Sequence, residues 1–231
     1  MKAFLKVVFL VVLILLSIAL LFVGNGYSMY KEAIENTPLE EKVEQIQEKE
    51  NYTELSELPQ IYLDAVISVE DHRFYQHPGI DIIAIGRAFI NDIKAMSYVE
   101  GGSTITQQLA KNIYFTQEKK MTRKIAEMFM AFNLERNLNK EEILELYLNT
   151  SYFGDGYDTV KEASRGYFGK EPNEMTDGEC VMLAGIPNAP SVYAPTVNPN
   201  LAKQRQKQVL DKMVKYKYLT QEEADKIYEE E

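Results

Sequence analysis

The sequence lacks several features that would place it in a large structural class at once. It has one cysteine, Cys180, so the chain cannot form an internal disulfide, and we expect this residue to be small and buried. It has no tryptophan, and no window shows sustained strict alternation of apolar and polar residues, so β-strands are not predicted. No Gly-Lys-Ser/Thr closes the glycine-rich turn at Gly101 and Gly102, which excludes a Walker A phosphate loop.

The chain also has fewer basic than acidic residues. The chain has 25 Lys and Arg against 35 Asp and Glu, a formal net charge of -10. Sequence-independent nucleic-acid binding needs a dense basic face, so no nucleic-acid partner is expected. Much of the acidity lies in one segment, residues 32–57, which contains Glu32, Glu35, Glu40, Glu41, Glu44, Glu48, Glu50, Glu54 and Glu57.

One long apolar run stands near the N-terminus. Every residue from Val7 to Val23 is apolar except Ser17, and as a helix this run spans roughly 26 Å, close to one hydrocarbon core. Lys2 and Lys6 precede it, so residues 1–6 are predicted to be a cytoplasmic tail and 7–23 a transmembrane anchor in the cell membrane. The alternative is a cleaved signal peptide, whose apolar core is normally only about 7–15 residues.

The rest of the chain is then predicted to lie outside the cytoplasm. Residues 24–57 are charged and poor in large apolar groups, which indicates a solvated stalk or exposed helix, and 219–231 indicate an acidic C-terminal tail. Between them, 58–218 show helical periodicity, and Asn139 with Glu142 and Thr176 with Glu179 are typical capping boxes. The predicted fold class is therefore mainly α. The helical spacings are Leu58, Ile61, Ala65 and Val69; Ile82, Ile85, Phe89, Ile93 and Met96; Met121, Ile125, Met128, Phe129 and Phe132; and Val209, Leu210, Met213 and Val214.

Three groups of residues could carry chemistry. Several ionisable groups lie between Glu70 and Asp81, where an apolar helix gives way to a Pro-Gly turn, and partial desolvation there would make an acid a better general base. A flexible turn at Gly101–Thr104 leads into a helix start that could bind an anion. The third group is basic and contains Lys111, Lys119, Lys120, Arg123 and Lys124, with Glu127 one turn beyond.

Each group also has a plain structural interpretation. The first is a solvated helix end, the second a turn with an N-cap, and the third a solvated basic face with i,i+4 ion pairs.

Together these groups leave two sugar chemistries open. A glycosidase must protonate a poor alkoxide leaving group with a carboxylic acid, whereas a sugar diphosphate needs only cations to stabilise charge that it already holds. Basic residues beside one glutamate favour the diphosphate. A muramidase-like hydrolase and a membrane-anchored binding protein without turnover remain the alternatives.

With these groups in this order, the sequence resembles the family 51 glycosyltransferases. This family is the peptidoglycan transglycosylase domain of class A penicillin-binding proteins and of monofunctional transglycosylases. The resemblance covers roughly residues 55 to 215. The motifs that carry it are the Glu70–Asp81 segment, Gly102-Ser103-Thr104-Ile105-Thr106-Gln107-Gln108, Arg123-Lys124 followed by Glu127, and Lys140-Glu141-Glu142-Ile143-Leu144-Glu145-Leu146-Tyr147-Leu148-Asn149.

The resemblance implies a mainly α, lysozyme-like transglycosylase fold with a head lobe and a smaller membrane-facing jaw lobe, plus the N-terminal transmembrane helix. Residues 82–100 match the mobile jaw, and their apolar face is expected either to pack in the core or to dip into the outer leaflet. The implied activity is polymerisation of lipid II into β-1,4-linked glycan strands with inversion and release of undecaprenyl diphosphate.

The resemblance also assigns roles. Glu70 matches the general base that takes a proton from the acceptor 4-hydroxyl, and Glu127 the glutamate that organises the donor diphosphate. Lys111, Lys119 and Arg123, with Lys124, are expected at the diphosphate. Asp71, Phe74 and His77 are expected around Glu70, and the expected cleft lining is Ser103, Thr104, Gln107, Gln108 and Asn112.

The partners follow from the same resemblance. They are lipid II, the growing lipid-linked glycan strand, the membrane, and a separate transpeptidase for crosslinking. A divalent cation, Mg²⁺ or Mn²⁺, would suit oxygen ligands and a phosphate substrate, although no spacing in the sequence shows a metal site by itself. No organic cofactor is expected.

Overall fold

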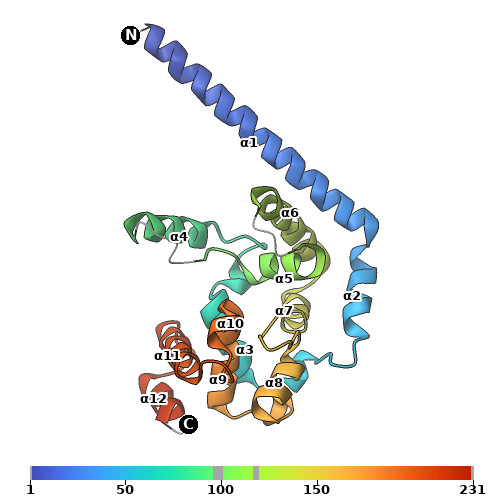
Figure 1. Ribbon diagram of the computed structural model, residues 1–231, viewed down its shortest axis with the longest axis vertical. Helices are drawn as coiled ribbons and strands as arrows, with labels where there is room; N and C mark the ends of the chain where they lie inside the picture. Colours follow the sequence, from blue (N-terminus) through green and yellow to red (C-terminus); the bar gives the residue numbers. More distant parts are fainter. Residues whose placement is uncertain (1, 96–100, 117–119, 230–231) are drawn as a thin grey trace.

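The computed structural model describes residues 2–95, 101–116 and 120–229 (Figure 1). Over these ranges the chain forms α-helices joined by short 3₁₀ turns and contains no strand, which confirms the mainly α class. The helices are α1 (Lys2–Asn36), α2 (Leu39–Gln47), α3 (Gln60–Glu70), α4 (Ile82–Ala95), α5 (Ile105–Tyr114), α6 (Met121–Asn137), α7 (Lys140–Leu148), α8 (Val160–Phe168), α9 (Asp177–Gly185), α10 (Pro190–Tyr193), α11 (Pro199–Lys215) and α12 (Gln221–Glu229).

Two predicted helix starts are present as capping boxes. The Asn139 side chain accepts a hydrogen bond from the Glu142 backbone N–H at 2.9 Å, and the Glu142 carboxylate accepts from the Asn139 backbone N–H at 2.7 Å. Thr176 and Glu179 make the same reciprocal pair at the start of α9. These bonds satisfy orphan N–H groups locally, so the start of each helix follows from a few residues of sequence.

The core places the end of α3 between two packed groups of helices. α3 packs against α9 and α11, while α5 packs against α6 and α7. Tyr62, Leu109 and Val209, from three different helices, are fully buried. Burial of each such side chain is worth about 1.5–3 kcal/mol, so the arrangement of these helices around the α3 C-terminus is strongly specified.

The predicted membrane anchor is the first part of one long helix. Phe4–Asn36 is apolar and long enough to cross a membrane by length and composition, with a mean hydropathy of 3.3 in its most apolar window. No part of that window is buried against the rest of the protein. Figure 1 shows α1 leaving the domain at the end where α4 and α6 lie, opposite α12 and the C-terminus.

Most of the segment 24–57 is helical, and its apolar residues pack on the domain, so it is neither a solvated stalk nor a fully exposed helix. α1 continues to Asn36, and Leu39 and Ile46 of α2 are buried in the main core. Leu39, Val43 and Ile46 follow the i, i+4, i+7 spacing of an amphipathic helix, a stripe that the surrounding glutamates conceal in a composition count. The prediction of a spacer was therefore wrong for these apolar residues.

The fourth motif fastens the end of this segment to α7. The Asn149 side-chain oxygen accepts from the Thr53 N–H and its amide donates to the Thr53 carbonyl, both at 2.8 Å. The Glu145 carboxylate accepts from the Leu55 N–H at 2.8 Å and from the Tyr52 hydroxyl. Asn149 is fully buried, so these bonds hold the segment in place and give the motif a structural role.

The C-terminal segment likewise forms part of the fold. Residues Gln221–Glu229 form α12, whose Ala224 and Ile227 are buried against the core. Lys203 of α11 lies over the Tyr228 ring, 4.6 Å from its centroid. The predicted acidic tail is acidic only on its outer face, because its apolar residues again recur at helical spacing.

Candidate active site

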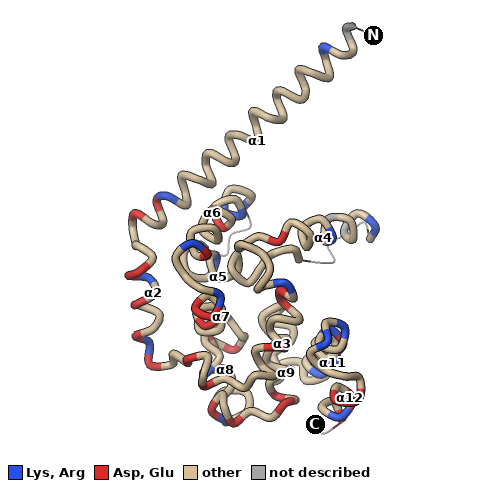
Figure 2. The backbone as a smooth tube through the Cα atoms, turned by 180° about the vertical axis from the view of Figure 1, so that it is seen from behind, with Lys and Arg blue, Asp and Glu red and all other residues tan. Residues whose placement is uncertain are grey.

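A cleft of about 760 Å³ opens where α3 ends, between α5 and α11. Figure 2 shows basic positions along α11 and near the start of α6, on the two sides of this region. Glu70 is the one carboxylate among the described residues that line the cleft, whereas five lining residues are Lys or Arg. These five are Arg87, Lys111, Arg205, Lys212 and Lys215.

Glu70 is the last residue of α3 and is held by one neutral partner. The Gln108 side-chain amide donates to Glu70 Oε2 at 2.8 Å, and the Tyr147 hydroxyl lies 3.5 Å from Gln108 Oε1. Glu70 Oε1 is buried and makes no hydrogen bond within the described part of the chain. A buried carboxylate oxygen without a donor is costly, and it is free to accept a proton from a bound hydroxyl.

The surroundings of Glu70 raise its pKa above the ordinary value. Burial is the main cause, because it disfavours the charged form. The Gln108 hydrogen bond and the nearby Arg205 and Lys111 cations oppose this effect by favouring the carboxylate, while Asp71 adds to it. A carboxyl with a raised pKa that still ionises is suited to general base catalysis.

Gln108 owes its position to the capping box that starts α5. The Thr104 hydroxyl accepts from the Gln107 N–H, and the Gln107 side chain accepts from the Thr104 N–H, both at 3.1 Å. The Thr104 hydroxyl also donates to the Gly79 carbonyl at 2.6 Å. Both Thr104 and Gln107 are buried, so they position α5 and do not line the cleft.

Asp71, Phe74 and His77 support the floor behind Glu70. The buried Asp71 carboxylate accepts from the Ile105 N–H at 3.1 Å and from His77 Nε2 at 2.9 Å. His77 Nδ1 accepts from the Gly79 N–H at 3.1 Å, which leaves the ring proton on Nε2, facing Asp71. Phe74 is fully buried. None of the three lines the cleft, so they fix the α3–α5 junction.

Glu127 lies in a different environment on α6. It is only 1% exposed, and its carboxylate pairs with Arg123 at 2.7 Å and Lys124 at 3.0 Å. Lys124 Nζ also donates to the Ser103 hydroxyl at 2.5 Å, which ties α6 to the turn before α5. Ser103 itself lines the cleft, so this network reaches the cleft wall.

Lys111 connects the two glutamates electrostatically. It lines the cleft on α5, and burial lowers the pKa of its ammonium group. The Glu127 carboxylate, and more weakly that of Glu70, raise this pKa, whereas Arg123 and Lys124 lower it further. Lys111 is therefore a partly desolvated cation between two acids, where its charge acts strongly on a bound anion.

The remaining predicted site residues are Asn112 and Lys119. Asn112 on α5 is half-buried and is not among the residues that line the cleft. Lys119 lies outside the described residues. The residues of the prediction that do meet at the cleft are Glu70, Ser103, Gln108 and Lys111, with Arg123, Lys124 and Glu127 directly behind Ser103.

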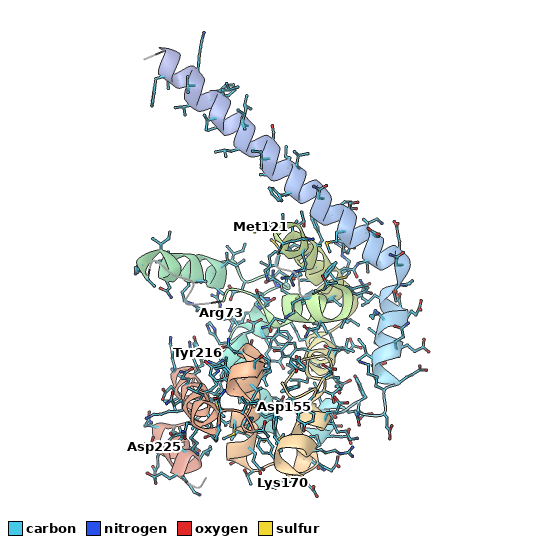
Figure 3. The ribbon with its side chains drawn as sticks, in the orientation of Figure 1. Arg73, Met121, Asp155, Lys170, Tyr216 and Asp225 are labelled. Atoms are coloured by element: carbon cyan, nitrogen blue, oxygen red, sulfur yellow. The ribbon has the colours of Figure 1, made fainter. Side chains whose placement is uncertain are left out.

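The sequence analysis missed the contribution of α11 and α4. Arg205 lines the cleft and is held by its Nε donating to the Gly185 carbonyl at 3.1 Å. His72 stacks on Tyr216, with ring centroids 4.0 Å apart, and Figure 3 shows Tyr216 at the end of α11. Arg205 stands in a run of Lys, Arg and Gln that resembles a solvated helix face, so only the packing of α11 reveals it.

The described residues do not fit a preformed divalent-cation cage. No group of three or more His, Cys, Asp or Glu side chains lies within metal-binding reach of one another in the described ranges. Glu127, the acid predicted at the diphosphate, already pairs with two cations. Because Mg²⁺ prefers several oxygen ligands, we assign the neutralisation of anionic charge here to Lys and Arg side chains.

The apolar face of α4 is exposed. Ile82 is 79% exposed and Ile93 60%, and Ile83, Ile85 and Ile90 are also exposed. Of the face predicted from the spacing, the Phe89 side chain and Met96 lie outside what the structure describes. The sequence predicted that this face either packs in the core or dips into the outer leaflet. The described part of α4 does not pack it in the core.

Comparisons with known proteins identify the family of the chain. Residues 36–214 match the family described as transglycosylase, so the match begins within the segment first interpreted as a stalk. The chain is 47% identical over 170 residues to penicillin-binding protein 1F of Bacillus subtilis (strain 168), covering 74% of this chain and 24% of that protein. It is 43% identical over 185 residues to penicillin-binding protein 1A of Neisseria cinerea, covering 80% and 23%.

One solved structure is also similar. The 2.6 Å crystal structure of penicillin-binding protein 1A from Haemophilus influenzae has a TM-score of 0.47 and 25% sequence identity, covering 78% of this chain and 17% of that one. The chain spans about a quarter of the length of the curated relatives that it matches. From its match over 36–214, together with a cleft that sets one glutamate among basic side chains, the chain belongs to the transglycosylase family.

Proposed function

We propose that this chain is a peptidoglycan glycosyltransferase that polymerises lipid II into β-1,4-linked glycan strands. The observation that carries the proposal is the half-buried carboxylate of Glu70, the one carboxylate among the described lining residues, in a cleft otherwise rich in cations. In the proposed reaction, Glu70 Oε1 accepts the proton of the acceptor 4-hydroxyl while that oxygen attacks the anomeric carbon of the donor strand. The bond from that carbon to the diphosphate breaks, and the configuration inverts.

The cations take up the charge of the leaving group. Lys111 is already partly desolvated, so its attraction for the departing undecaprenyl diphosphate is stronger than in water. Arg123 and Lys124 are oriented by Glu127, which supports a positioning role for that glutamate. No step of this proposal requires a metal ion, because the charge is met by side chains of the chain itself.

The same cleft argues against the hydrolase alternative. Glycoside hydrolases of the usual kind place two carboxyl groups across the scissile bond, about 5–5.5 Å apart in retaining and about 6.5–9.5 Å apart in inverting enzymes. Among the described lining residues only Glu70 is a carboxylate, and the adjacent Asp71 is buried and engaged with His77. The described lining therefore does not offer the second acid that hydrolysis needs.

The helices at one end of the domain support a location at the membrane. Lys2 and Lys6 before the apolar run favour a cytoplasmic N-terminus with the domain outside. The exposed isoleucines of α4 lie at the end of the domain from which α1 leaves, so we propose that this face enters the adjacent leaflet (Figure 1). The cleft then opens near the plane that holds a polyprenyl-linked substrate.

The test is polymerisation of fluorescent lipid II by the purified chain, with and without Mg²⁺ and with Glu70→Gln as control. Products are resolved on a gel. A ladder of long glycan strands from the wild type alone supports the proposal. Soluble fragments released from finished peptidoglycan without lipid II consumption would instead establish a hydrolase, and bound but unconverted lipid II a binding protein.

A further inference from the structure

A second cavity, of about 670 Å³, lies between α1 and α6, away from the cleft. Its wall is aromatic on one side and charged on the other. Tyr27 meets Phe129 edge to face, with ring centroids 5.2 Å apart, and Phe132 is 45% exposed. Lys31 and Arg136 supply the basic groups of the lining.

The helices that form this cavity are fixed against one another. Gly26 is buried on α1, and a Cβ there would meet Ile125 Cγ2 at 2.6 Å and the Thr122 carbonyl oxygen at 3.0 Å. The Asn133 side-chain amide donates to the Tyr30 hydroxyl at 3.1 Å. Figure 3 shows Met121, at the start of α6, beside α1. The cavity is therefore a built feature of the α1–α6 contact.

Within the described part of the chain, Lys31 and Arg136 are not neutralised by strong ion pairs. Among the described residues Lys31 forms an ion pair with Glu35 alone, at 3.7 Å, and both side chains are well exposed, so this pair is weak. Arg136 makes no ion pair with any described residue. The one acid of the lining, Glu135, is already compensated, since Lys140 donates to it at 2.7 Å and the Thr106 hydroxyl at 2.6 Å.

The position of the cavity along α1 identifies its occupant. With Val7–Val23 in the hydrocarbon core, Tyr27 lies about 6 Å and Lys31 about 12 Å beyond it along the helix. The headgroup layer on each side of a bilayer is about 5–8 Å deep. Tyr27 therefore lies at the depth of the lipid headgroups, and the Lys31 side chain, which leans back toward the N-terminus of α1, extends toward the lipid phosphates from just outside that layer.

We propose that the α1–α6 cavity binds one anionic glycerophospholipid of the adjacent leaflet. Its phosphate is held by Lys31 and Arg136, and its acyl chain lies along Phe129 and Phe132. The site is separate from the cleft around Glu70 and does not require glycosyl transfer. A bound lipid would fill the wedge between anchor and domain and fix the height of the domain above the bilayer.

The experiment is native mass spectrometry of the full chain released from nanodiscs of equal parts phosphatidylglycerol and phosphatidylcholine. We expect the wild type to retain one phosphatidylglycerol in preference to phosphatidylcholine. The double variant Lys31→Ala/Arg136→Ala should reduce the preference for phosphatidylglycerol on the order of twentyfold. Each basic residue near a membrane surface contributes about fivefold to such a preference. The matched control Lys49→Ala/Lys161→Ala removes the same charge elsewhere and should retain the lipid.

Two further variants separate the site from its alternatives. Gly26→Val keeps both cations but forces α1 away from α6, and should also lose the retained lipid. Lys111→Met alters the proposed donor site and should leave retention unchanged. Equal retention by the wild type and the Lys31/Arg136 double variant would overturn the proposal. So would displacement of the lipid by millimolar inorganic phosphate, which would indicate a free-phosphate site.

Discussion

The two glutamates of the site, Glu70 and Glu127, have the same side chain in contrasting electrostatic environments. Glu70 has one neutral amide donor, a second oxygen without a hydrogen bond in the described structure, and a raised pKa caused by burial. Glu127 is 1% exposed and is bracketed by Arg123 and Lys124. A carboxylate whose one hydrogen bond comes from a neutral amide is ready to take a proton. A buried carboxylate between two cations holds those side chains in place, even though Glu127 Oε1 also makes no hydrogen bond within the described part of the chain.

The contrast separates chemical and structural importance. Loss of the Glu70 carboxylate removes a reactive group and also a costly buried charge. Loss of the Glu127 carboxylate leaves Arg123, whose side chain is only 12% exposed, without its partner, whereas Lys124 is 40% exposed and keeps its bond to Ser103. The variants that follow would break or sharpen this distinction, in order of decreasing effect.

Glu70→Gln is expected to lower lipid II polymerisation by about 10²–10⁴-fold, the usual contribution of a general base. The amide cannot take up the proton, although its shape is retained. Because the pKa of Glu70 is raised in the folded state, its ionisation costs stability as pH rises through that pKa, so the variant should be at least as stable as the wild type at neutral pH. Gel assay and thermal unfolding measure the two effects, and a destabilised variant would contradict the description of Glu70 as poorly compensated.

Glu127→Ala is expected to lower the free energy of unfolding by about 3 kcal/mol, because removal of one partner from a buried ion pair leaves uncompensated charge. Activity should fall with it. Denaturant unfolding gives the stability, and Glu127→Gln, which keeps the volume, is the matched control that should recover part of it. An unchanged midpoint for Glu127→Ala would show that the Arg123 and Lys124 pairs contribute nothing to the fold.

Lys111→Met is expected to lower kcat/KM for lipid II by about 10–100-fold with little change in stability, since the cation is aimed at transition-state charge in a partly desolvated place. Lys207→Met, on the exposed face of α11, is the control and should act as the wild type. Initial rates over a range of lipid II concentrations separate the two variants. Equal rates would remove Lys111 from the proposed diphosphate site.

Gln108→Leu should change the pH dependence more than the maximal rate. The Gln108 amide lowers the pKa of Glu70 by favouring the carboxylate, so its loss raises that pKa further. Since the base must be ionised, the acid limb of the kcat/KM profile should move to higher pH. Tyr147→Phe, which removes only the hydroxyl 3.5 Å from Gln108 Oε1, should cause a smaller shift in the same direction. An unmoved acid limb in both would mean that another group controls it.

The sequence could predict what depends on near neighbours. Helix starts such as Asn139 with Glu142 are confirmed, because a capping box involves residues three apart. The resemblance likewise assigned Glu70, Ser103, Gln108 and Lys111 to one site, and in the structure these four residues line the same cleft. The resemblance placed Thr104 in the lining of the cleft, yet Thr104 is buried, because a motif shows that residues belong together and not which of them faces the cavity.

By itself the sequence determined the helical class and the apolar run from Val7 to Val23, since these follow from periodicity and length. Only the tertiary structure decided which faces are covered. It buried Leu39 and Ile227 in segments that composition indicates as solvated, brought Arg205 of α11 to Glu70 of α3, and set α1 against α6 at Gly26. Those outcomes depend on contacts between residues far apart in the chain, where packing and desolvation act and local propensity carries no information.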